Sequence, residues 1–304
     1  MSMLITNRAV LFRTVHHMRF VFTAALLCTV LPSRAYASSL ASTSAASICL
    51  NKQLAKHSHH QVVFQGHPSA VCSRTMASST TPDPAIQEIL DFWFGLDPGQ
   101  WFTDAQLDKP IKERFSHLVE KARLTNELDS TWLSTPSGSL AMILLLDQFT
   151  RNIFRPGNHE NPGLSWSGDA KALRIATNSI AKGFDRQIEA EYASHEGLGI
   201  SHRIFVYMPY MHAEDLLAQV TSCALFESMK NEFETKRLQR QIEGKEETEQ
   251  EKAVAAQLSM SVPFAAKHRD CVAAVGRFPK RNEPLGRTSS QAEIEWLEKY
   301  PQGF

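Results

Sequence analysis

The chain has 304 residues, of which 43% are hydrophobic and 21% charged, so it is long enough to bury a core and is neither disordered throughout nor collagen-like. Its 32 basic and 32 acidic residues give a formal net charge of zero. The distribution is uneven, however, because no acidic residue precedes Asp83, whereas residues 1–82 carry seven basic ones. Residues 83–304 therefore hold 25 basic and 32 acidic residues, a net charge of −7. A net-acidic folded part argues against sequence-independent nucleic-acid binding, which depends on neutralising phosphates.

Residues 1–80 have the composition of a targeting segment and are predicted to form an unstructured leader. Phe20–Leu31 is an apolar run of about a dozen residues, shorter than the roughly 20 that a transmembrane helix needs. Arg19 precedes this run and Ala35-Tyr36-Ala37 follows it, in the order of a secretory signal and its cleavage site. Residues 38–75 then continue rich in Ser, Ala and basic residues, as in an organelle transit peptide.

The leader therefore predicts a protein delivered to a plastid or mitochondrion and cleaved on arrival. Two alternatives stay open: a secretory signal alone, or a cytoplasmic protein whose translation starts at Met76. No transmembrane span is expected in the mature protein.

Residues 81–304 are predicted to form one domain made of helices. Asp83 and Pro84 make an N-cap followed by proline at the first helical position, and Gly95 ends the apolar pattern that follows. A helix opening at Thr135-Pro136 contains the nearly continuous apolar run Leu140–Phe149 and should be central. Further helices are expected from about residue 108, over 169–182, toward Pro209 with a break or kink there, over about 212–229 and 262–275, and from Ser290 with a capping box to Glu293.

No segment of this domain alternates with the period of two that marks a β-strand, so the predicted fold class is all-α with helices in antiparallel pairs. Residues 231–252 hold many charges and few apolar residues, which predicts an exposed insertion, either a solvated helix extension or a charged loop. Cys223 and Cys271 lie in apolar helical stretches and are expected to be buried without a disulfide. No zinc spacing, GxSxG, phosphate-binding loop or dinucleotide fingerprint occurs, so no cofactor or metal is predicted.

Polar residues interrupt the apolar pattern in the segment 147–155. Asp147, Arg151 and Arg155 follow one another at a spacing of four, which places them in one row of a helix, and Gln148 and Asn152 form the adjacent row. Buried charges are costly unless they are paired. These residues therefore either satisfy one another or line a cavity.

A second polar set lies around Pro209. His212 and Asp215 are three residues apart and can share a helix face, and Tyr207 precedes them. Acidic residues in a first helical turn are also favoured by the helix dipole without any function. With Asp147 or His268, this pair offers the side chains for a metal or acid–base site.

The third polar set follows the helix that ends at Gly276. Arg277 and Arg281, with Lys280 and Arg287, form a basic loop punctuated by proline that can hold a phosphate or carboxylate. The same side chains can instead cap helix carboxyl ends.

These three segments together resemble the signatures of the DUF924 family. The matching strings are DQFTRNIFR at 147–155, RIFVYMPYMHAEDL at 203–216 and GRFPKRNEPLGR at 276–287, and ILDFWFG at 89–95 and Trp101-Phe102 also fit. The resemblance implies an all-helical, tetratricopeptide-like domain of uncharacterised function over about 83–304. In two respects the chain departs from the family: the charged stretch 231–252 is longer than the usual spacer, and Lys280 stands where the family often has histidine.

Three hypotheses follow for function. The first is a binding or scaffold domain that recognises a peptide, protein or small anionic ligand in a polar groove. The second is a hydrolase-like or metal-dependent enzyme that uses His212, Asp215 and Asp147. The third is a purely structural network, in which Asp147–Arg151 and the basic loop pair internally. The candidate ligand-binding residues are Asp147, Arg151, Asn152, Arg155, Tyr207, His212, Asp215, His268, Arg277 and Arg281.

Overall fold

The computed structural model of the chain describes residues 83–103, 105–193 and 199–301, and the fold below is that of these segments. The predicted leader, residues 1–80, lies outside them, so its predicted targeting role stays a prediction. The described segments belong to one compact unit that extends over Met76–Phe304.

This unit is built of helices, and the described part of it contains no β-strand, which confirms the all-α prediction. In chain order the elements are α1 (Pro84–Phe94), α2 (Gln100–Thr103), η1 (Ala105–Leu107), α3 (Asp108–Leu124), α4 (Asp129–Trp132), α5 (Pro136–Ile143), η2 (Leu144–Phe149), α6 (Thr150–Ile153), η3 (Pro162–Trp166), α7 (Asp169–Ala181), α8 (Phe184–Glu191), α9 (Gly199–His212), α10 (Leu216–Ile242), α11 (Glu249–Val275), η4 (Pro279–Arg281) and α12 (Gln291–Lys299). None of the helices in these segments is long and apolar enough to span a membrane.

The predicted helix starts are confirmed where a capping residue marked them. The side chain of Asp83 accepts a hydrogen bond from the backbone N–H of Ala85 at the start of α1. At the start of α12, Ser290 and Glu293 form the reciprocal capping box that their spacing predicted. Short-range chemistry therefore decided where these helices begin.

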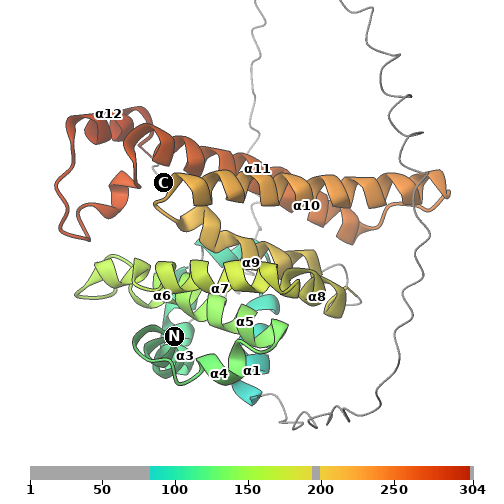
Figure 1. Cartoon of the computed structure of the whole chain (residues 1–304), viewed down its shortest axis with the longest axis horizontal. Helices are drawn as coiled ribbons and strands as arrows, with labels where there is room; N and C mark the ends of the chain where they lie inside the picture. The colour runs from blue at the N-terminus through green and yellow to red at the C-terminus, as the bar shows by residue number, and fades with distance from the viewer. Residues whose placement is uncertain (1–82, 104, 194–198, 302–304) are drawn as a thin grey trace, which may run out of the picture. The chain divides into compact units, whose positions relative to one another are not determined.

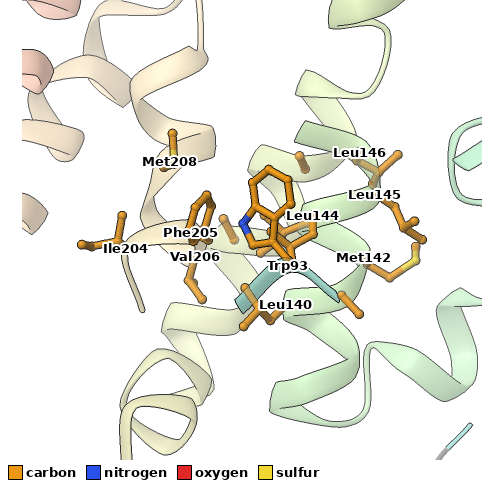
Figure 2. Packing of buried hydrophobic residues seen from close by; sticks show 14 of the residues in the cluster. Trp93, Leu140, Met142, Leu144, Leu145, Leu146, Ile204, Phe205, Val206 and Met208 are labelled. Carbon is orange, nitrogen blue, oxygen red and sulfur yellow. The ribbon is translucent and has the colours of Figure 1, made fainter. Parts of the chain in front are cut away.

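The core lies where α1, α5, η2 and α9 meet (Figure 2). Trp93 of α1 is fully buried and packs its ring against Phe149 at 5.5 Å and against Phe205 of α9 at 5.5 Å. The run Leu140–Phe149 is buried at every position, so the prediction of a central helix is confirmed. Cys223 and Cys271 are buried free thiols, also as expected.

The second half of that central helix is not an ordinary α-helix. Residues Leu144–Phe149 form a π-helical segment between α5 and α6. Such segments are rare and occur often at functional sites, because the wider turn changes the direction of the side chains it carries. This one carries Asp147, so the local helix type bears directly on the candidate site.

Several predicted helix bounds differ from the structure. Of the break or kink expected at Pro209, the break is wrong, since α9 continues through Pro209 to His212. Helices α10 and α11 also extend much further than the apolar pattern indicated, and the charged segment 231–252 forms the tip of the hairpin they make (Figure 1). Arg237 and Arg240 of α10 pair across the hairpin with Glu247 and Glu251, which supports the helical residues on either side of the turn at 243–248.

Candidate functional site

A cluster of charged side chains connects three helices and the loop that follows α11. We define the His212 cluster as Asp147, Arg151, Asp169, His212 and Arg281. His212 Nδ1 lies 2.7 Å from Oδ1 of Asp147 and 2.9 Å from its Oδ2. Residues 65 positions apart in the sequence are thereby joined at the C-terminal end of α9.

Asp147 is fully buried, and its ionised form is held by its neighbours. Burial by itself would raise the pKa of this carboxyl group, but the positive charge of Arg151, the charge of His212 and the hydrogen bonds from His212 and Gln148 outweigh burial and hold the pKa well below its usual range. An ionised carboxylate only accepts hydrogen bonds, so Nδ1 of His212 carries the hydrogen and donates it. In the neutral ring, Nε2 is then the acceptor.

Nε2 of His212 makes no hydrogen bond to any residue in the segments that the structure describes. The His212 side chain keeps 12% of its surface exposed, while Asp147 has none. The buried carboxylate of Asp147 therefore orients the imidazole of His212 through Nδ1, and Nε2 is the ring nitrogen that remains for a ligand or substrate. This is the arrangement that orients a histidine for acid–base chemistry or for ligand binding.

Two guanidinium groups share a second carboxylate in the cluster. Arg151 Nη2 donates to Asp169 Oδ2 at 3.1 Å, and Arg281 Nη1 donates to the same oxygen at 3.0 Å. Arg281 also donates from Nη2 to the backbone carbonyl of His212 and lies 4.5 Å from the ring centre of Phe278. Arg281 therefore ties the loop after α11 to the end of α9.

The position of Asp169 depends on the glycine that precedes it. A Cβ atom on Gly168 would lie 2.3 Å from the backbone oxygen of Leu146, so only glycine lets the start of α7 approach the π-helical segment this closely. That approach brings Asp169 beside Arg151. Asp169 was not among the predicted site residues, and its only sequence signal is the Gly-Asp start of a helix.

His268 lies beside the cluster on α11, with its ring centre 6.1 Å from that of His212. Its Nδ1 lies 2.8 Å from the backbone oxygen of Phe264. Burial, followed by the nearby charge of His212, lowers the pKa of His268 to about 3 despite the hydrogen bond to Phe264. His268 is therefore neutral at physiological pH.

This burial has a consequence for stability in mild acid. Because the pKa of His268 is lower in the folded protein than the usual 6.5, the unfolded chain binds its proton first, and the contribution to stability is complete above pH 6.5 and lost as the pH falls toward 3. Between pH 7.5 and 5.5 we expect the unmodified protein to lose about 1 kcal/mol more stability than His268→Gln does. Urea unfolding at the two pH values measures this, with the exposed His117→Gln as control. Equal pH dependence of the His268→Gln variant and the unmodified protein would contradict the expectation.

Asn152 and Arg155, two of the predicted site residues, belong to a different network. Arg155 Nε donates to Asp108 Oδ2 at 2.7 Å and its Nη2 to Oδ1 at 3.0 Å, while Asn152 Nδ2 donates to the same carboxylate at 2.9 Å. Asn158 donates a fourth hydrogen bond at 2.6 Å. These contacts attach α6 and the loop after it to the start of α3, which is a structural role.

Tyr207 faces a buried network on α9 that is also separate from the cluster. Its hydroxyl donates to Asp185 Oδ2 at 2.6 Å and accepts from Arg203 Nε at 2.7 Å. Burial and the hydrogen bond to Asp185 raise the pKa of Tyr207 far above its usual value. The contacts of Tyr207 thus serve to position Arg203, which the sequence analysis did not select.

Asp215 and Arg277 have local partners as well. Asp215 is the N-cap of α10 and accepts from the backbone N–H of Ala218 at 2.8 Å. Arg277 Nη2 donates to Glu293 at 3.0 Å, which joins the basic loop to α12. Neither residue reaches His212, so the structure does not bring together the predicted trio of His212, Asp215 and Asp147.

Glu214 is a further residue that the predicted list omitted. It accepts two hydrogen bonds from Arg287, at 2.6 and 2.9 Å, and one from the backbone N–H of Phe278 at 2.9 Å. The ion pairs of its arginines therefore hold the basic loop to neighbouring parts of the fold.

No group of three or more His, Cys, Asp or Glu side chains in the described segments is arranged to hold a metal ion.

Fold and site together define an all-helical domain with one buried carboxylate–imidazole pair flanked by arginines. The family model described as "Bacterial protein of unknown function (DUF924)" matches residues 89–300, so the chain belongs to the DUF924 family. A solved structure titled "Structure of Protein of Unknown Function ATU0120 from Agrobacterium tumefaciens" is 31% identical, with a TM-score of 0.51, and the match covers 71% of this chain and 98% of that one. No curated protein matches the chain.

Proposed function

We propose that the protein is a helical binding domain that takes a small anionic ligand at the His212 cluster. The observation that carries the proposal is the buried Asp147–His212 pair, whose imidazole keeps Nε2 available at the surface beside Arg151 and Arg281. An N–H on Nε2 of the protonated ring can donate to a phosphate or carboxylate oxygen, and the two guanidinium groups add a favourable field.

The charge balance of the cluster supports an anion rather than a cation. Arg151 and Arg281 offset Asp147 and Asp169, so the cluster is neutral with a neutral His212 and positive with a protonated one. An anion would meet two guanidinium groups in this cluster, whereas the two carboxylates are already hydrogen-bonded to the arginines and to His212. The other predicted residues form structural pairs, so the proposed site consists of the His212 cluster and His268.

Calorimetric titration of the full chain with inorganic phosphate and with acetate tests the proposal. We expect both anions to bind at neutral pH, because the guanidinium groups of Arg151 and Arg281 can donate hydrogen bonds to an anion oxygen. His212→Asn is the informative variant, since an amide N–H can keep the hydrogen bond to Asp147 while Nε2 is lost. It should weaken binding by about tenfold, as the loss of a charge-assisted hydrogen bond does.

The matched control is His117→Asn, which changes an exposed histidine on α3 and should leave binding unchanged. Absence of binding for both anions, or equal affinity of His212→Asn and the unmodified protein, would refute the proposal. Melting curves of both variants show whether the fold is retained.

A second candidate function is acid–base catalysis of hydrolysis, favoured specifically by the 2.7 Å contact between Asp147 and His212. An imidazole oriented in this way can take a proton from water through Nε2 as the water attacks an ester or phosphoester, and can return that proton to the alcohol or phenol as its bond to the acyl or phosphoryl group breaks. Hydrolysis of p-nitrophenyl acetate or p-nitrophenyl phosphate that is lost in His212→Asn would support this function. Anion binding without turnover would support the binding domain.

A further inference from the structure

A cavity of about 390 Å³ lies at the other end of the α10–α11 hairpin from the basic loop. Its walls come from the end of α8, the first turn of α9, the second half of α10 and the start of α11, and we call it the hairpin pocket. None of its lining residues belongs to the His212 cluster. Its volume falls in the range of roughly 300–1,000 Å³ that small-molecule sites occupy.

The inner wall of the hairpin pocket is apolar. Phe233 of α10 and Val254 of α11 are core residues that present one edge to the cavity, and Ile200 at the start of α9 is half-buried beside them. An apolar wall of this kind gains free energy by burying the hydrocarbon part of a ligand. The wall therefore selects a ligand with an apolar body.

The rim of the pocket carries more positive than negative charge. Lys236, Arg237 and Arg240 line it together with only two carboxylates, Glu189 and Glu251. The side chain of Lys236 is 69% exposed, so its ammonium group can move toward a ligand at low cost.

Both rim carboxylates already have partners, and each of them also contacts one of the rim cations. Glu189 Oε2 accepts from the buried Arg203 at 2.8 Å, and Lys236 contacts only its other oxygen, at 3.3 Å. Glu251 Oε2 accepts from the backbone N–H of Thr248 at 2.8 Å in the capping box of α11. Arg240 Nε lies 2.7 Å from the other oxygen of Glu251, and Arg237 Nε lies 2.6 Å from Glu247. Lys236 has the longer and more exposed contact, so it is the rim cation that a ligand reaches at the lowest cost.

We propose that the hairpin pocket binds a small amphipathic organic anion. Its apolar body lies against Phe233, Val254 and Ile200, and its carboxylate meets Lys236 at the rim. The charged tip of the hairpin is then part of a ligand site in addition to being a solvated extension. This inference does not depend on the function proposed for the His212 cluster.

Titration of the full chain with octanoate, and with octylamine and octan-1-ol as probes of equal chain length, tests this site. Octanoate is expected to bind more tightly than either of the others, because only its head group carries the charge that the rim favours. Lys236→Glu should weaken octanoate binding by at least about fivefold, which is the size of one exposed charge interaction. Lys230→Glu makes the same change on α10 outside the pocket and should have little effect.

Ile200→Trp provides a second variant that fills the pocket without touching the rim charges, and it should reduce octanoate binding in a protein that still melts cooperatively. Equal affinity for octanoate and octan-1-ol, or unchanged octanoate binding in both Lys236→Glu and Ile200→Trp, would overturn the proposal. The same comparisons are repeated in the His212→Asn background, where the proposed anion site is disabled, so failure here and failure of that site are separate results.

Discussion

Replacing Asp147 with alanine is expected to lower the free energy of unfolding by about 3–5 kcal/mol, the usual cost of removing one partner from a buried ion pair. Asp147 is fully buried and holds Arg151, His212 and Gln148. Without the carboxylate, the positive charge of Arg151 loses a buried partner, and the N–H groups of His212 and Gln148 lose their acceptor.

Urea unfolding at pH 7 measures this loss. Asp147→Asn is the matched variant, because it keeps the shape of the side chain and removes only the charge, and it should cost less than alanine. A loss below about 1 kcal/mol for Asp147→Ala would show that the pair contributes no more than an exposed ion pair does.

The same carboxylate predicts the direction of the pH dependence. The pKa of Asp147 is lower in the folded protein than its value of 3.8 in the unfolded chain, so the unfolded state takes up its proton first as the pH falls. The stability that Asp147 contributes is therefore complete above about pH 4 and is lost below it. Asp147→Asn should unfold with a weaker dependence on pH in this acid range.

Replacing Arg203 with leucine is expected to have a similarly large effect, a loss of about 3–5 kcal/mol. Arg203 is only 1% exposed, and its Nη1 donates to Glu189 at 2.8 Å and to Glu232 at 2.9 Å. The hydrogen bonds from Arg186, and then the hydrogen bonds and charge of Arg203, lower the pKa of Glu232 to about 2 although burial opposes this. Removal of Arg203 leaves two carboxylates near one another without their shared cation.

The control for Arg203 is Arg114→Leu, which breaks an exposed ion pair with Glu88 and should change stability by less than about 1 kcal/mol. Thermal and urea unfolding of both variants give the comparison. An Arg203→Leu variant as stable as the unmodified protein would contradict this expectation. It would show that apolar packing of leucine substitutes for the buried ion network.

Much of the fold was predictable from short stretches of sequence. Asp83-Pro84, Thr135-Pro136 and the pair Ser290 and Glu293 each satisfy backbone N–H groups within a few residues, so the helix starts follow from local chemistry. The apolar run Leu140–Phe149 likewise predicted the centre of the core. The extension of α10 and α11 toward the tip of their hairpin was not predictable from apolar spacing, because ion pairs across the hairpin support it.

The candidate site was predictable only in part, because its residues pair across long sequence distances. Asp147, Arg151, His212 and Arg281 were selected as polar residues in apolar surroundings, and these four do lie together. Asp169 and Asp108 bind arginines of the segment 147–155, but no sequence pattern around either aspartate marks it as a site residue. Asp215 was selected for its spacing from His212, yet its side chain caps α10.

The sequence by itself determined that the described segments after residue 83 are built of helices that bury apolar faces, and that the chain resembles the DUF924 family, because caps, apolar periodicity and motif strings are all local. Only the tertiary structure decided which buried charges meet. A carboxylate can pair with any cation that the packing brings within reach, and the π-helical turn at Asp147 and the close approach at Gly168 direct these particular side chains toward His212.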